Sequence, residues 1–202
     1  MRIGVDFDNT LVCYDRAFAA VGKEAGLLSA DFAGGKDAAK RWLLGERPDG
    51  YLWERLQGLV YGQRIDRAEV YQGAAEFFRH CREQDGWQVY VVSHKTAFAH
   101  HDPLRTDLRA SALGWMRRQG FFAQDGFGLD VDQVFFEDTR EAKVRRIGEL
   151  NCQIFVDDHP EVLGHAAMPA GCRKILFATE HSGPFERAAN WNEVCAAVFQ
   201  PA

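Results

Sequence analysis

A short apolar run near the start of the chain, ending in acidic residues, constrains the fold more than any other feature. Residues 3–7 have the length and apolar character of a buried strand, which places Asp6 near its carboxyl end and Asp8 just beyond it. Open α/β sheets bind ligands at the carboxyl ends of their strands. Two carboxylates spaced in this way suit a hard cation such as Mg²⁺, and one of them is placed to attack an electrophile. Turn aspartates that cap a helix are the alternative interpretation.

Later apolar runs predict the other strands of the same sheet. These runs are residues 88–93, 134–136, 154–156 and 174–177. Ser93 ends the first of them, and the adjacent acids Asp157 and Asp158 follow the third. Amphipathic segments separate the runs, so we expect an α/β fold with a doubly wound parallel sheet, its first strand central and helices on both faces.

Three helices are predicted between these strands. Residues 73–84 form one of them, and a second begins at Asp102-Pro103 and ends before Gly120. The third begins at Asp138, which forms a capping box with Glu141.

About eighty residues separate the first two predicted strands, although a parallel crossover needs only about a dozen or somewhat more. The excess predicts a helical insertion, with helices at 14–23, 36–44 and 51–61 separated by glycine-rich turn signals. We therefore expect a core domain of residues 1–14 and 71–202 and an insertion of residues 15–70.

Asp6, Asp8 and Thr10 resemble the first motif, Asp-x-Asp-x-Thr, of the haloacid dehalogenase superfamily. Ser93 resembles its second motif and Lys143, fourteen positions before Asp157, its third. The fourth motif is similar to the pair Asp157 and Asp158. The resemblance implies a Rossmann-like core and makes residues 15–70 a small helical cap that closes over the site and selects the substrate.

The same resemblance implies a role for each motif. Asp6 would be the nucleophile that becomes an aspartyl-phosphate, and Asp8 the general acid and base. Three side chains would stabilise the transferring phosphoryl group: Thr10, Ser93 and Lys143. Mg²⁺ would be held by Asp6, by the Asp8 backbone carbonyl and by the acidic pair Asp157 and Asp158, without the sequence deciding which of the two is the direct ligand.

We therefore expect a magnesium-dependent phosphatase acting on a small soluble phosphomonoester, either a sugar phosphate or a nucleotide. Dehalogenases of the superfamily lack an acid at the position of Asp8, which disfavours that activity. A phosphomutase, a binding protein without turnover and a phosphoryl-accepting signalling protein of the receiver type are the alternatives. In receiver domains the adjacent acids follow the first strand, whereas here they come late in the chain.

Other residues carry weaker expectations. His94 and Lys95 follow the second strand and are expected substrate contacts, and Lys95 is also the substitute for Lys143 should that lysine lie on a solvated basic face. Four aromatic residues of the insertion are expected to form its core more often than to touch substrate: Trp42, Tyr51, Trp53 and Tyr61.

Composition limits the remaining possibilities. The 202 residues include 24 basic and 29 acidic side chains, a net charge of -5 that argues against nucleic acid as a partner. No apolar run has the length of a membrane span, and no signal peptide is predicted. The five cysteines lack metal-ligand spacing, which favours reduced thiols in a cytoplasmic protein. The expected partner is a small phosphorylated molecule, and no oligomeric state is predicted.

Overall fold

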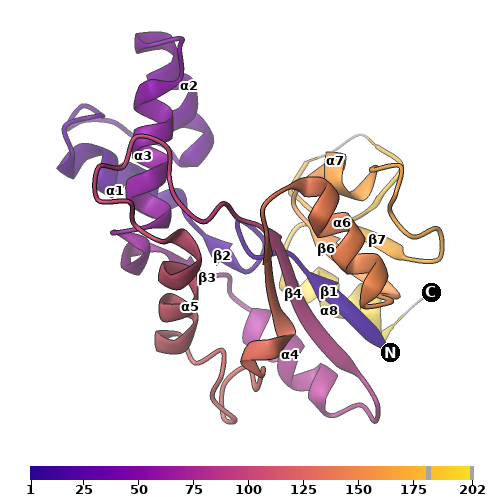
Figure 1. The fold of residues 1–202 in the computed structure, drawn as a ribbon. Coiled ribbons are helices and arrows are strands. Elements are labelled where there is room, and N and C mark those ends of the chain that lie inside the picture. The colour runs from indigo at the N-terminus through magenta and orange to yellow at the C-terminus, as the bar shows by residue number, and fades with distance from the viewer. Residues whose placement is uncertain (181–182, 201–202) are drawn as a thin grey trace. The chain divides into compact units, whose positions relative to one another are not determined.

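A six-stranded parallel sheet dominates the computed structural model, which describes residues 1–180 and 183–200. The strands lie in the order β5-β4-β1-β6-β7-β8. Their bounds are β1 Arg2–Val5, β4 Gln88–His94, β5 Val134–Glu137, β6 Ile154–Asp157, β7 Arg173–Phe177 and β8 Glu186–Ala188. All five predicted strands are present, and the first lies inside the sheet between β4 and β6, as Figure 1 shows.

Strand β1 pairs with segments that are far away in the sequence. Ile3 lies opposite Val89 on one side and Ile154 on the other. Its neighbour Gly4 lies so close to the Phe155 ring that an added Cβ would stand 2.5 Å from a ring carbon. A glycine is therefore needed at the centre of this strand, because any larger residue would push that ring out of the core.

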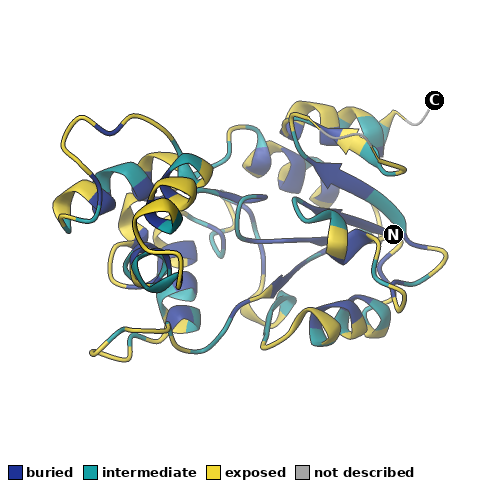
Figure 2. Ribbon diagram, turned by 90° about the horizontal axis from the view of Figure 1, so that it is seen from above, coloured by how far each residue is buried: buried dark blue, intermediate teal, exposed yellow. Residues whose placement is uncertain are grey.

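Helices cover both faces of the sheet (Figure 1). Helices α6 (Arg140–Glu149) and α7 (Pro160–Leu163) lie on one face and share a buried cluster with Phe155 and other strand residues. Helices α4 (Ala74–Arg82) and α8 (Trp191–Phe199) lie on the other, where the Phe77 and Trp191 ring centroids are 5.0 Å apart. Figure 2 shows mostly buried strands between helices with exposed outer faces, the arrangement expected for a doubly wound sheet.

The Cα positions divide the chain into two compact units. The first holds the large sheet and comprises Met1–Leu11, Val70–Lys95 and the chain from Gln119 onward. The second comprises Val12–Glu69 together with Thr96–Arg118. It therefore includes a segment after β4 that we did not expect, and the assignment of residues 15–70 as a cap stays a prediction.

The second unit is helical, with the three helices expected from the sequence. They are α1 Asp15–Glu24, α2 Lys36–Glu46 and α3 Tyr51–Tyr61, followed by the short 3-10 helix η1 Ile65–Arg67. Phe18 stacks on Trp53 at 5.1 Å between ring centroids and meets Tyr61 edge-on at 5.7 Å. Trp53 and Tyr61 thus pack in the core of the unit, as expected, whereas Trp42 is about half exposed.

Two helix starts differ from the prediction. Helix α5 spans Leu108–Arg118 and begins after Asp107, whose carboxylate accepts hydrogen bonds from the backbone N–H groups of Arg109 and Ala110. Asp102 makes the same kind of bond to Leu104, but within a loop, so a helix start at Asp102-Pro103 was wrong. Helix α6 is capped by the Thr139 hydroxyl, which accepts from the Ala142 N–H, and not by Asp138.

Four short elements complete the described chain. Strands β2 (Val12–Cys13) and β3 (Glu69–Val70) form a separate two-stranded sheet. The 3-10 helix η2 (Val131–Gln133) leads into β5, and β8 adds an edge strand that the sequence did not predict. Within residues 1–180 and 183–200, no helix combines the length and apolar character needed to cross a membrane.

Candidate active site

Three neighbouring strands deliver polar side chains to one edge of the sheet. Asp6 directly follows β1, Ser93 is the next-to-last residue of β4, and Asp157 is the last residue of β6. Because β1 runs parallel to both neighbours, the carboxyl ends of all three strands meet at this edge. Lys143, in the second turn of α6, adds a cation from the helix that packs on β4 and β5.

The carboxylate of Asp6 is buried and lies between a hydroxyl and a cation. Its Oδ1 accepts a hydrogen bond of 2.9 Å from Ser93 Oγ and one of 2.5 Å from Lys143 Nζ. The same ammonium donates to Asp157 Oδ2 at 2.6 Å. The backbone N–H of Asp6 donates to the Val156 carbonyl at 2.9 Å, which fixes the residue beside β6. One lysine therefore joins the acids that follow β1 and end β6.

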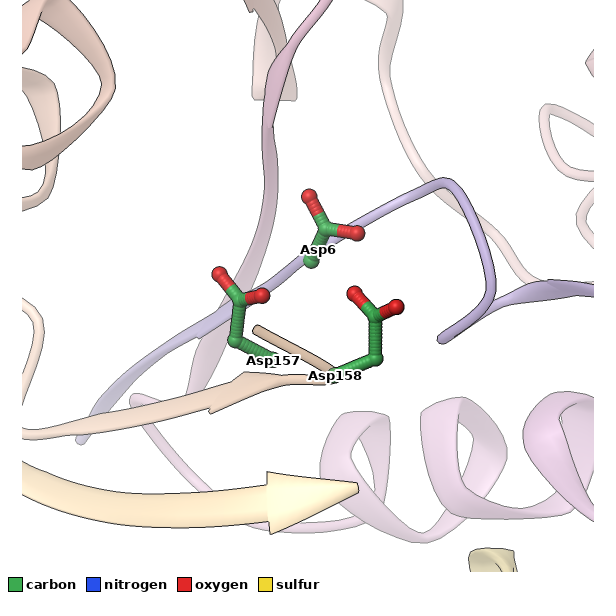
Figure 3. A group of neighbouring side chains, drawn as sticks. All are labelled: Asp6, Asp157 and Asp158. Atoms are coloured by element: carbon green, nitrogen blue, oxygen red, sulfur yellow. The ribbon is translucent and has the colours of Figure 1, made fainter. Parts of the chain in front are cut away.

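Three carboxylates gather at this edge. One oxygen each from Asp6, Asp157 and Asp158 lies within 4.8 Å of the others, and Figure 3 shows the three groups around a common space. Like charges so close repel one another, and Lys143 alone offsets only part of that charge. Clustered carboxylate oxygens are the donor set that Mg²⁺ prefers, so these residues fit the cation that the sequence predicted.

Asp6 and Lys143 form a buried pair, and the pKa values of both are raised. Burial is the largest influence on Asp6, and with the Asp157 and Asp8 carboxylates it raises the pKa to about 6 against the opposing Lys143 ammonium. Burial alone would lower the pKa of Lys143, but the carboxylates of Asp157 and Asp6 outweigh it and raise that pKa. Lys143 therefore stays protonated, while Asp6 is a carboxylate of raised basicity.

The two late acids have different surroundings. Asp157 is fully buried, and its oxygens accept from Lys143 and, at 2.8 Å, from the His159 N–H. Asp158 is half-buried, and its Oδ2 accepts from Asn9 Nδ2 at 3.2 Å. The Asp158 N–H donates to the Thr10 hydroxyl at 3.2 Å, which ties the loop after β1 to the end of β6.

Asp8 has a cation of its own. Lys95 Nζ donates to both oxygens of the Asp8 carboxylate, at 2.7 and 3.0 Å. This lysine directly follows β4 and is almost fully buried, with the side chain 2% exposed. The carboxylate of Asp8 thus pairs with Lys95, whereas Lys143 pairs with Asp6 and Asp157.

The structure brings most of the predicted residues together. Asp6, Ser93, Lys143, Asp157 and Asp158 form one connected group, and the Thr10 hydroxyl contacts its margin. Lys143 is buried, so it does not lie on a solvated basic face. It contacts both Asp6 and Asp157, so Lys95 is not needed as the substitute for it. The roles assigned to these residues stay predictions.

His94 was expected to contact substrate, and Asn9 was not predicted as a site residue. His94 is exposed, and its Nε2 lies 3.0 Å from the Asp138 carbonyl oxygen. Asn9, which we had not selected, has a left-handed backbone with φ 61° and holds Asp158 through its amide. Its place between Asp8 and Thr10 was the available signal for a left-handed turn, because asparagine tolerates this conformation better than most residues.

No protein-family model and no curated protein sequence matches this chain, but solved structures do. A haloacid dehalogenase-like hydrolase from Streptococcus pneumoniae is 15% identical, with TM-score 0.60 and 98% of each chain covered. A subfamily IA hydrolase of the superfamily from Geobacter sulfurreducens is also 15% identical, with TM-score 0.59, covering 98% of this chain and 95% of that one.

A third relative was solved with ligands. This hydrolase of the same family from Deinococcus radiodurans, with bound phosphate and sodium, is 16% identical with TM-score 0.52, and the match covers 98% of this chain and 94% of that one. Because the identity is so low, these matches establish the fold alone. The described chain therefore has the fold of the haloacid dehalogenase superfamily, as the four motifs implied.

Proposed function

We propose that this protein is a magnesium-dependent phosphatase that hydrolyses a small soluble phosphomonoester through an aspartyl-phosphate. One observation carries the proposal: the buried Asp6 carboxylate follows the central strand, accepts a hydrogen bond from the Lys143 ammonium and gathers with the carboxylates of Asp157 and Asp158. A nucleophile beside a fixed cation and a cation-binding cluster suits attack on a charged phosphate. Bound phosphate in the relative from Deinococcus radiodurans agrees with this choice.

The cation would be held by Asp6, Asp158 and the Asp8 backbone carbonyl. We assign the direct contact to Asp158 because both oxygens of Asp157 already accept hydrogen bonds from other groups. When bound, Mg²⁺ would offset the negative charge shared by the phosphate and these carboxylates. Asp157 would then act mainly by holding Lys143 against Asp6.

In the first step an Asp6 oxygen attacks phosphorus, the ester P–O bond breaks, and Asp8 gives a proton to the departing alkoxide. In the second step Asp8 takes a proton from water, whose oxygen attacks phosphorus and releases Asp6 and inorganic phosphate. Lys143, Ser93 and Thr10 would stabilise the charge of the transferring group in both steps. An acid at position 8 suits this proton transfer and is dispensable for dehalogenation.

The substrate class follows from this chemistry only as far as the ester. We propose a sugar phosphate or a nucleotide, with residues 15–70 acting as the cap that selects it. A panel of phosphorylated metabolites assayed with Mg²⁺ tests this part of the proposal, and hydrolysis of neither class would contradict it.

Hydrolysis of p-nitrophenyl phosphate with Mg²⁺ tests the reaction itself. We expect turnover by the wild type and a loss of about 10⁴-fold or more in Asp6→Asn, as is typical when a covalent nucleophile is removed. Asp132→Asn is the matched control, because it makes the same change at an exposed residue outside the cluster.

Trapping the intermediate separates the alternatives. Acid-quenched wild type should carry one phosphoryl group in intact-mass spectra, and Asp6→Asn none. A phosphorylated Asp6 that persists without turnover would indicate a signalling protein instead. Equal activity of Asp6→Asn and wild type would contradict the proposal altogether.

A further inference from the structure

Lys95 and Asp8 form a second ion pair beside the cluster of Asp6, Asp157 and Asp158. Lys95 Nζ contacts both carboxylate oxygens of Asp8, at 2.7 and 3.0 Å. The lysine side chain is 2% exposed and that of Asp8 18%. A buried ammonium is costly unless it is paired, and contact with both oxygens limits how far the carboxylate can turn or move.

The sheet explains how the chain places this cation. Ser93 and Lys95 are two positions apart along β4 and its extension, so their side chains lie on the same side. Ser93 donates to Asp6 and Lys95 to Asp8, each across a separation of 87 residues. The contact of Lys95 with Asp8 thus repeats the contact of Ser93 with Asp6, two residues further along each segment.

The backbone and an aromatic ring hold Lys95 in this position. Its N–H donates to the Glu137 carbonyl at 2.8 Å, which continues the pairing of β4 with β5. Its ammonium lies 5.5 Å from the centre of the Phe7 ring, and Phe7 in turn packs edge-on against Phe136 at 5.6 Å. Lys95 is therefore built into the sheet edge and has almost no exposed surface with which to meet a substrate.

We propose that Lys95 is a positioning residue that orients the Asp8 carboxylate for proton transfer, in place of the substrate contact expected from the sequence. This rests on the proposed phosphatase function. Asp8 gives its proton to the ester oxygen as the P–O bond breaks, and later takes one from the attacking water. Lys95 exchanges no proton with the substrate, and its contribution depends entirely on Asp8.

The leaving group supplies a readout that a purely structural role would not change. p-Nitrophenolate is a weak base that departs with little protonation, whereas an alkoxide needs a proton from Asp8. The value of kcat/KM reports the steps up to release of the leaving group. We expect Lys95→Met to lower kcat/KM about 10- to 100-fold for glycerol 2-phosphate and much less for p-nitrophenyl phosphate, within the range of general acid catalysis.

A double-mutant cycle completes the experiment. For glycerol 2-phosphate, we expect Lys95→Met to have no further effect once Asp8→Asn is present, because Lys95 acts only through that carboxylate. Lys174→Met is the control, since Lys174 lies at the amino end of β7, away from the site edge. Lys95→Gln, which keeps an NH₂ donor group without the charge, should retain part of the activity.

The outcomes are distinct. Equal losses on both substrates, combined with multiplication of the Lys95→Met and Asp8→Asn effects, would show a separate role such as substrate contact and overturn the inference while leaving phosphatase function intact. A wild type that hydrolyses neither ester would overturn both proposals. Thermal melting checks that each variant folds, and Lys95→Gln provides the same cycle should Lys95→Met fail to fold.

Discussion

At the scale of single residues, the buried charge of Asp6 lowers the stability of the fold, although the proposed reaction requires it. Its pKa is raised from 3.8 to about 6, chiefly by burial, so the folded state binds this proton more tightly than the unfolded chain does. The charge on Asp6 therefore costs nothing below about pH 4, destabilises the fold increasingly as the pH rises toward 6, and has its full effect above that. The pKa difference corresponds to about 3 kcal/mol, which is an upper limit.

Asp6→Asn should accordingly stabilise the metal-free protein while abolishing turnover. We expect a gain of about 1–3 kcal/mol in unfolding free energy at pH 7, shrinking toward zero near pH 4. Denaturant titrations of both proteins with a chelator at the two pH values measure it. A gain that is the same at pH 4 and pH 7 would show that ionisation of Asp6 is not its cause.

Asn9 combines a backbone and a side-chain requirement, and two substitutions separate them. Asn9→Gly keeps the left-handed conformation but removes the amide that holds Asp158, so we expect near-normal stability and Mg²⁺ affinity about 10-fold weaker or more. Asn9→Ala should also lose about 1 kcal/mol of stability through backbone strain. Calorimetric Mg²⁺ titration and denaturant unfolding report the two effects, and unchanged affinity in both variants would contradict this role.

The motifs predicted the acids of the site because each acid directly follows an apolar run. They did not predict Asn9 or the pairing of Lys95 with Asp8. Those contacts depend on the register of strands more than eighty residues apart and on the left-handed turn after β1. Spacing within one segment contains no information about strand register, and an asparagine beside the acids indicates a left-handed turn but not the contact with Asp158.

At the scale of elements, helix α6 acts as the support of Lys143. Its first turn is capped by the Thr139 hydroxyl, just as Asn190 caps α8 by accepting from the Glu193 N–H. A lost cap typically costs about 1 kcal/mol and frays the first turn. Because Lys143 lies one turn further on, fraying of α6 should disturb its bridge between Asp6 and Asp157.

Thr139→Ala and Asn190→Ala form a matched pair. We expect both to lose about 1 kcal/mol of unfolding free energy, and only Thr139→Ala to lower kcat, because α8 carries none of the proposed catalytic groups. Urea unfolding and steady-state kinetics on the two variants provide the comparison. Equal kcat values would show that Lys143 is held independently of the cap.

The elements that the sequence failed to predict have physical reasons. Strand β8, Glu186–Ala188, is short and polar and takes its conformation from pairing with β7 at the sheet edge. The start of α5 was placed too early because Asp102 makes the same local hydrogen bonds in a loop that Asp107 makes at the helix. Buried apolar runs, by contrast, indicated five strands correctly.

At the scale of the whole molecule, the proposed cation site would couple metal binding to stability. A cation that binds only the folded state relieves the repulsion among Asp6, Asp157 and Asp158. At one hundred times its dissociation constant it would add about 2.7 kcal/mol to the unfolding free energy.

We expect Mg²⁺ to raise the melting temperature, EDTA to reverse the rise, and Asp158→Asn to remove most of it. Asp132→Asn should respond to Mg²⁺ like the wild type. Scanning calorimetry with and without the cation decides the matter. An identical rise in Asp158→Asn and wild type would place the cation elsewhere.

The pairing of β1 with β4 and β6 also has a consequence during protein synthesis. Residues 3–5 find their last partners only when residues 154–156 have left the ribosome, so the acids following β1 stay separated from Asp157 and Asp158 for most of translation. Such long-range pairing slows folding and leaves incomplete chains prone to aggregation. A nascent or prematurely terminated chain therefore lacks the assembled cluster, and the proposed hydrolytic activity should arise late, together with the finished fold.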